Sequence, residues 1–187
     1  MSTAIFLPLA VVFATAVFAL VWVMVRTVAR FQGKMLVTCP ETDEAVGVEV
    51  DVKNAALRAA VGDRALHLKS CTRWPERQNC GQECLHQIEL GPENCLVRTL
   101  VAEWYRGKTC LLCNRPFDEI HWHDHKPALM RMSDKHTFAW PEIAVEKLPE
   151  ILNTYKPVCW NCHVVETFRR ERPELVVERP WRRGHLV

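Results

Sequence analysis

The sequence predicts a single N-terminal transmembrane helix followed by a small, cysteine-rich α+β domain that is stabilised by metal. Three observations lead to this fold class. Residues 4–25 contain no charged side chain, nine cysteines are spread over the remainder of the chain, and short strand-like and helix-like patterns alternate between them. With 187 residues, 49% of them hydrophobic, the chain has enough apolar material for one domain core besides the helix.

The first element is the apolar run from Ala4 to Val25. As a helix it would be ~33 Å long at 1.5 Å per residue, which is enough to cross a hydrocarbon core of ~30 Å. A cleaved signal peptide would have positive charge before the apolar run and a small-residue cleavage site after it, whereas Met-Ser-Thr precedes this run and Arg26–Arg30 follows it. We therefore expect residues 1–30 to form a retained anchor with a basic flank, and the lipid bilayer to be one partner.

The charges beside the anchor predict its orientation. No lysine or arginine precedes the helix, while Arg26, Arg30 and Lys34 follow it. The positive-inside rule then predicts a single-pass protein of the cell membrane, with the N-terminus outside and the C-terminal domain in the cytoplasm. In that reducing compartment disulfides are disfavoured, and nine cysteines would leave at least one unpaired in any case.

Residues 31–106 are predicted to form an α+β region. The patterns indicate, in order, the two strands of a β-hairpin with Cys39 at its turn, a helix ended by Gly62, a strand, a polar loop and two helices. The ranges are Met35–Thr38, Val46–Val52, Lys53–Val61, Ala65–Lys69, Cys71–Cys84, Gln82–Leu90 and Cys95–Arg106.

Residues 107–175 are predicted to form a metal-binding region, and residues 176–187 a basic tail. Short strands are expected over Thr109–Pro127, and a helix over Val145–Thr154. A last helix is expected over Val164–Arg172, ended by Pro173.

Two CxxC pairs are the clearest chemical signal. Cys110 and Cys113 form one pair, and Cys159 and Cys162 form the other at the start of a predicted helix, where the helix dipole stabilises thiolates. Two thiolates at this spacing can point into one tetrahedral shell, and a second pair completes it at Zn–S distances of ~2.3 Å. The four cysteines are therefore predicted to bind zinc.

The segment Cys110-Leu-Leu-Cys113-Asn-Arg-Pro-Phe117 resembles a zinc knuckle, with two ligands followed by a polar turn and an apolar residue. Together the two pairs resemble the treble-clef and zinc-ribbon group of metal sites. The resemblance covers these local motifs only. It implies a ligand set and no family function.

A second interpretation of the C-terminal pair is haem attachment. Cys159-Trp-Asn-Cys162-His163 matches the CxxCH motif of c-type cytochromes, in which both cysteines form thioethers and the histidine is the axial ligand. The chain would then be a membrane-anchored monohaem cytochrome for electron transfer. Candidate distal ligands are Met130, Met132 and His123. We favour zinc, because the domain is expected in the cytoplasm and the motif has a partner CxxC pair.

Five cysteines remain outside the CxxC pairs. Four of them, from the hairpin turn and the polar loop, are candidates for a second tetrahedral site, with Cys95 left as a buried helix residue. This second set is Cys39, Cys71, Cys80 and Cys84. The alternative is a mixture of buried free thiols and, if the topology is reversed, disulfides.

Other patterns indicate no further site. His121, His123 and His125 alternate as in a strand, and we favour an exposed strand over a secondary metal site. Arginines near the C-terminus alternate with glutamates, so no nucleic-acid partner is expected.

The sequence contains no phosphate-binding loop, nucleophile elbow or catalytic carboxylate pair, so we expect a protein that is not an enzyme. A zinc ion with four protein thiolates would contribute folding energy and have no open position for a substrate. The predicted function is a membrane-anchored, zinc-binding interaction or assembly module with an unidentified protein partner.

Overall fold

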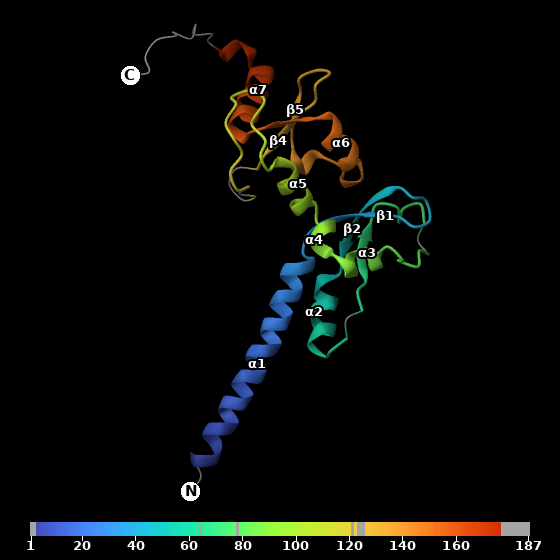
Figure 1. The fold of residues 1–187 in the computed structure, drawn as a ribbon, viewed down its shortest axis with the longest axis vertical. Helices are drawn as coiled ribbons and strands as arrows, with labels where there is room; N and C mark the ends of the chain where they lie inside the picture. Colours follow the sequence, from blue (N-terminus) through green and yellow to red (C-terminus); the bar gives the residue numbers. More distant parts are fainter. Residues whose placement is uncertain (1–2, 64, 78, 121, 123–125, 177–187) are drawn as a thin grey trace. The chain divides into compact units, whose positions relative to one another are not determined.

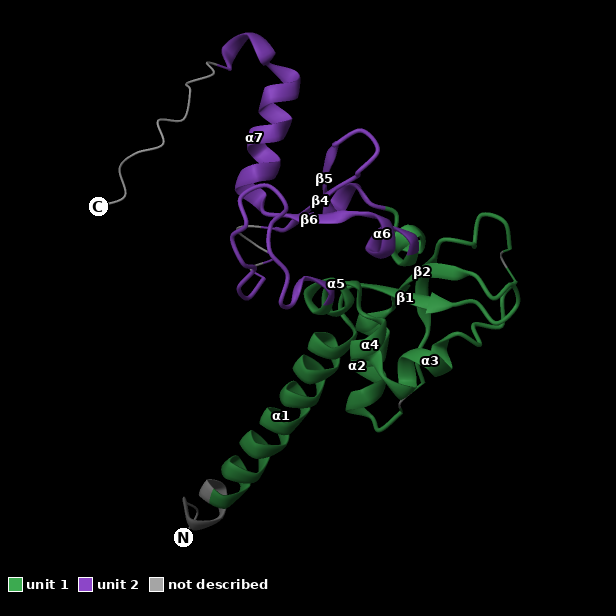
Figure 2. Cartoon of the chain, turned by 45° about the horizontal axis from the view of Figure 1, so that its top comes forward, with its two compact units in different colours: residues 1–103, 144–149 green, residues 104–143, 150–187 purple. Residues whose placement is uncertain are grey.

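The structure, a computed structural model, describes residues 3–63, 65–77, 79–120, 122 and 126–176. The chain forms two compact units, shown in different colours in Figure 2. Unit 1 comprises residues 1–103 and 144–149, and unit 2 comprises residues 104–143 and 150–187. Helix α5 (Val97–Tyr105) leads the chain from unit 1 into unit 2.

Helix α1 (Thr3–Phe31), blue in Figure 1, confirms the predicted N-terminal helix. The most apolar 18-residue window of its segment Pro8–Phe31 has a mean hydropathy of 2.5, and none of that window is buried. Phe13 and Phe18 are 71% and 69% exposed. The core helix of a soluble protein would bury such side chains, so α1 resembles a membrane-spanning helix in length, composition and exposure.

Three antiparallel strands form the sheet of unit 1 in the order β1 (Lys34–Thr38), β2 (Ala45–Val50) and β3 (Leu68–Cys71). The predicted hairpin is confirmed, with Thr38 opposite Ala45 next to the turn. Strand β3 starts three residues later than predicted, because its pairing with β2 begins where Leu68 meets Val50. Cys71 is thereby placed at the end of β3.

This part of the chain also forms the helices α2 (Val52–Ala60), α3 (Leu85–Leu90), α4 (Pro92–Cys95) and α5. The predicted helix from Cys95 to Arg106 is divided, because Leu96 has an extended backbone with φ −65° and ψ 121°. Cys95 therefore ends α4, where it is buried as expected.

Unit 2 is built on a second antiparallel sheet with β4 (Ala128–Met130) between β5 (Thr137–Ala139) and β6 (Lys156–Val158). Helix α7 (Trp160–Glu171) packs against β4 and β5. The chain also contains α6 (Leu148–Thr154), which matches part of a predicted helix, and three short 3-10 turns. The turns are η1 (Trp140–Glu142), η2 (Val145–Lys147) and η3 (Pro173–Leu175).

Two expectations for unit 2 need correction. In the described part of Thr109–Pro127, the pairing is a single bridge between Thr109 and Pro116 and not a set of strands, because residues 110–115 close a tight turn. Helix α7 begins at Trp160 and not at Val164, so His163 is helical. His121, His123 and His125 lie outside the described residues, as does the tail from residue 177 onward.

Candidate metal centre

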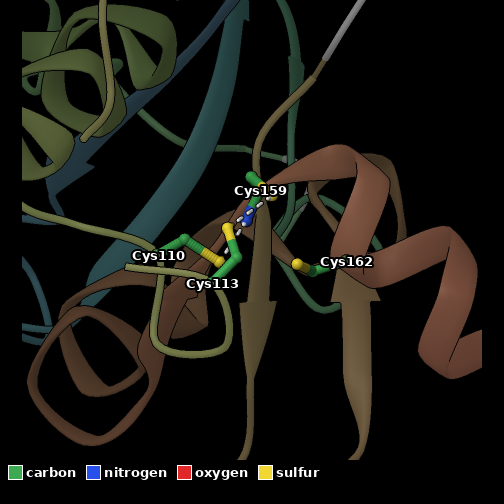
Figure 3. A group of neighbouring side chains, drawn as sticks. All are labelled: Cys110, Cys113, Cys159 and Cys162. Atoms are coloured by element: carbon green, nitrogen blue, oxygen red, sulfur yellow. Dashed lines mark hydrogen bonds between the residues drawn. The ribbon is translucent and has the colours of Figure 1, made fainter. Parts of the chain in front are cut away.

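Four cysteines of unit 2 lie together, and their sulfur atoms are all within 4.8 Å of one another (Figure 3). The set is Cys110, Cys113, Cys159 and Cys162. The Sγ atoms of Cys113 and Cys159 are 3.8 Å apart, and all four thiols are free. Tetrahedral zinc with bonds of ~2.3 Å places its sulfur ligands ~3.8 Å apart, whereas a disulfide needs ~2.05 Å. The spacing is therefore that of metal ligands.

A tight turn positions the first pair. The Cys110 N–H donates to Arg115 O at 2.9 Å, and the Asn114 N–H donates to Cys110 O at 2.9 Å. Asn114 has φ 56°, a left-handed conformation that asparagine tolerates better than most residues. Within this turn the N–H groups of Leu112 and Cys113 bond to the Cys110 sulfur. The turn thus holds both sulfurs on one side and stabilises charge on the first.

Helix α7 positions the second pair. Cys159 is its N-cap, with extended φ −76° and ψ 158°, and Cys162 lies in the first turn. The positive end of the helix dipole favours thiolates at this place. Two backbone bonds tie the pairs together: Leu111 N–H donates to Pro157 O at 2.9 Å, and Cys159 N–H donates to Cys110 Sγ at 3.3 Å.

The thiols of the centre differ in acidity. Burial opposes ionisation of Cys110, but hydrogen bonds from the N–H groups of Cys159, Cys113 and Leu112 outweigh it and lower the pKa to about 7. Burial raises the pKa of Cys162, and the neighbouring sulfurs of Cys159 and Cys113 raise it further. Such close thiols ionise together only when a cation offsets their repulsion. The centre is therefore suited to a divalent metal ion.

His163 lies next to the centre but is not among its candidate ligands. It is 8% exposed, and its Nδ1 shares a hydrogen bond with Thr137 Oγ1 at 2.9 Å. Burial lowers the pKa of His163, which favours the neutral ring. Thr137 was not singled out from the sequence, because nothing in the spacing of residues 137 and 163 indicates that they meet.

The second predicted set also comes together, although more loosely. Its four cysteines line one cavity of unit 1, while Cys95 lies outside that lining. Among the described residues, only the cluster of unit 2 has three or more potential ligand atoms all within 4.8 Å of one another. Arg73 is a further residue that sequence reasoning missed: its guanidinium donates to Cys39 Sγ at 2.8 Å. The sequence predicts the loop that contains Arg73, but it does not indicate the hydrogen bond to Cys39, which lies 34 residues away.

The candidate donor set of the centre in unit 2 is four sulfur atoms, the number of ligands that a tetrahedral metal ion takes. No protein-family model matches this chain, and comparisons with curated proteins and with solved structures found no significant match. What the centre does must therefore follow from its own residues.

Proposed function

We propose that Cys110, Cys113, Cys159 and Cys162 bind one structural zinc ion, and that the chain is a membrane-anchored, non-catalytic module for interaction or assembly with a protein partner. The observation behind this proposal is the convergence of four sulfurs from a knuckle turn and a helix start. Four thiolates suit zinc, whereas magnesium and calcium prefer oxygen ligands.

A structural role is supported by the position of the centre in unit 2. Cys110 is buried in an apolar cluster with Met130 and Val158, and Phe117, Cys159 and Cys162 pack against this cluster. The strands of the neighbouring sheet have three residues each, so they provide few ladder hydrogen bonds. Apparent zinc binding of ~10–16 kcal/mol would offset the ordering of this segment.

The proposed role at a membrane rests on α1 and on exposed apolar surface elsewhere. Helix α1 is long and apolar enough to span a bilayer. On α7, the side chains of Val164, Val165 and Phe168 are nearly half exposed, which offers apolar surface to a protein partner. Arg26 and Arg30 follow the apolar segment and favour a cytoplasmic domain.

The haem alternative meets a packing difficulty. A macrocycle joined to Cys159 and Cys162 needs space beside their sulfurs, and the sulfurs of Cys110 and Cys113 lie within 4.8 Å of them. The zinc proposal uses all four sulfurs, whereas attachment of haem leaves the knuckle pair without a role. This difference supports zinc.

Metal analysis and a visible spectrum of the full-length protein in detergent test the proposal. We expect a colourless protein that contains zinc, and loss of one zinc equivalent in Cys113→Ser. His163→Ala should keep its zinc, because His163 is outside the donor set. A red protein that loses covalent haem in His163→Ala and is unaffected by Cys113→Ser would establish the cytochrome alternative.

Orientation is tested on intact cells with a membrane-impermeant thiol reagent. We expect no labelling of the nine cysteines until the cells are opened. Strong labelling of intact cells would place the domain outside and contradict the proposed topology.

A further inference from the structure

A cavity of about 40 Å³ in unit 1 is surrounded by cysteines from separate segments. Cys39 follows β1, Cys71 ends β3, and Cys80 and Cys84 belong to the segment that leads into α3. Cys39 and Cys84 are only 6% and 5% exposed. The volume exceeds the ~10–15 Å³ that one water needs but is far below the ~300 Å³ of a small organic-ligand pocket. The cavity has the size for an ion.

The turn at Cys39 repeats the backbone of the Cys110 knuckle. Cys39 N–H donates to Glu44 O at 2.8 Å, Asp43 N–H donates to Cys39 O at 2.9 Å, and Asp43 has φ 55°. The corresponding values at Cys110 are 2.9 Å, 2.9 Å and 56°. The two cysteines therefore occupy the same position of the same turn.

The likeness extends to the sulfur atoms. The Cys39 sulfur accepts a hydrogen bond from the Arg73 guanidinium at 2.8 Å, and the Cys110 sulfur accepts one from the Cys159 N–H at 3.3 Å. Thr42 stands where the knuckle has Cys113, so this turn supplies one sulfur and not two.

The backbone turn alone does not indicate metal. The turn between β4 and β5 has the same form, with Arg131 N–H donating to His136 O at 2.8 Å and Lys135 at φ 55°. Its first position is an arginine, which has no sulfur to offer. What Cys39 and Cys110 share is a sulfur at the first position of this turn that accepts a hydrogen bond from another segment.

The other three cysteines line the same cavity from different segments. Gln82 N–H donates to Cys80 Sγ at 3.3 Å, so a backbone N–H group holds this sulfur. Cys84 is buried and directly precedes α3. A divalent cation that binds all four thiolates would draw the four sulfurs inward.

Arg73 provides the charge that such a centre lacks. Four thiolates and one Zn²⁺ have a net charge of −2, and a hydrogen-bonding guanidinium next to a ligand offsets part of it. Arg73 donates to Cys39 Sγ at 2.8 Å and lines the cavity together with Arg77. Burial opposes ionisation of Cys39, but hydrogen bonds from Glu41, Thr42 and Arg73 hold its pKa below the usual value.

From this geometry we infer that Cys39, Cys71, Cys80 and Cys84 bind a second structural zinc ion in unit 1, with Arg73 as a positioning residue that donates to the Cys39 thiolate. This second centre is independent of the function proposed above. Each unit of the protein then contains one zinc.

Zinc content of the full-length protein in detergent tests the inference. We expect two equivalents per chain in the wild type, one in Cys84→Ser, one in Cys110→Ser and none in the double variant. Cys95→Ala is the matched control: Cys95 is a buried cysteine of unit 1 outside the cavity lining, so this variant should keep two equivalents.

A measurement on the wild type covers the case in which Cys84→Ser fails to fold. Zinc-edge X-ray absorption should show four sulfur neighbours at ~2.3 Å for both equivalents. A wild type without zinc, or with disulfides among the four cysteines of the cavity, would overturn the inference. Loss of zinc in Cys110→Ser but not in Cys84→Ser would overturn it as well, while the zinc site of unit 2 would stand.

Discussion

The two cysteine clusters obtain four sulfurs in different ways. In unit 2 the sulfurs come as two CxxC pairs and lie within 4.8 Å of one another. In unit 1 a turn supplies only Cys39, and a strand end and a loop supply the others around a cavity of about 40 Å³. In a CxxC pair, the local backbone turn fixes the positions of the two sulfurs relative to each other. Single ligands depend on the packing of the segments that hold them.

The two cysteine clusters also differ in the amount of buried apolar material around them. Among the described residues, Cys39 and Cys84 belong to a hydrophobic cluster with 13 buried residues, whereas the cluster that contains Cys110 has three. Apolar burial contributes ~25 cal/mol per Å², so unit 1 retains a large stabilising term without metal. We therefore expect the region of the unit 2 centre to depend more strongly on its zinc than unit 1 does.

The largest expected effect comes from removing one ligand in each unit. Cys162→Ser should release the zinc of unit 2 and unfold the segments around it, because apparent zinc binding of ~10–16 kcal/mol is comparable to the whole stability of a domain. Cys84→Ser should leave unit 1 compact but less stable. Limited proteolysis with mass spectrometry measures this as new cleavage within residues 104–143 and 150–176 in Cys162→Ser alone. Equal protease resistance of Cys162→Ser and wild type would contradict the comparison.

Thr42 and Cys113 occupy the same position of the two turns. Exchanging these residue types tests whether zinc affinity depends on a CxxC pair or on the packing of separate segments. Cys113→Thr converts the knuckle into the single-cysteine form, and Thr42→Cys makes the opposite change in unit 1. We expect Cys113→Thr to lose the zinc of unit 2, as Cys113→Ser does. Release of the unit 1 zinc to a chelator should be about tenfold slower in Thr42→Cys, equivalent to ~1.4 kcal/mol. The measurement is the release rate followed with a zinc-sensitive dye. Unchanged release in Cys113→Thr would mean that its sulfur is not a ligand.

A smaller effect is expected at His163, which is beside the centre of unit 2 but not part of it. His163→Ala leaves the buried Thr137 hydroxyl without its 2.9 Å partner and should lower the free energy of unfolding by about 1–3 kcal/mol. Denaturant unfolding measures this loss. Adding Thr137→Val removes the unpaired hydroxyl and should restore part of the stability. A loss of zinc in His163→Ala would instead make the histidine a ligand.

The smallest effect concerns Arg73 in unit 1. Its hydrogen bond lowers the pKa of Cys39, so Arg73→Gln should raise that pKa, reduce the thiolate fraction near neutral pH and slow alkylation of Cys39 in the metal-free protein by about two- to tenfold. Arg77→Gln is the control. Arg77 forms an ion pair with Glu41 at 3.1 Å, as Arg73 does at 3.4 Å. Within the described part of the chain, Arg77 makes no hydrogen bond to Cys39. Equal alkylation rates in both variants would contradict the role of Arg73.

Features set by short-range spacing could be predicted from the sequence. The apolar run became α1, the alternation around residue 39 became the β1–β2 hairpin, and each CxxC spacing indicated two sulfurs on one side of the chain. The errors were also local: the break at Leu96 depends on a single extended residue, and the early start of α7 depends on how Cys159 caps the helix. Hydrophobic periodicity does not resolve such boundaries to within a few residues.

The meeting of distant groups was decided only by the tertiary structure. The two CxxC pairs are joined by a hydrogen bond from Cys159 N–H to Cys110 Sγ across 49 positions. The Cys110 turn is held there by Leu111 N–H, which donates to Pro157 O of β6. The loop before α3 folds back, so Cys80 lines the cavity together with Cys39. Cys95 is not part of this lining. Local propensities act over a few residues, whereas these contacts follow from the packing of distant segments within each unit. Their partners therefore cannot be inferred from spacing along the chain.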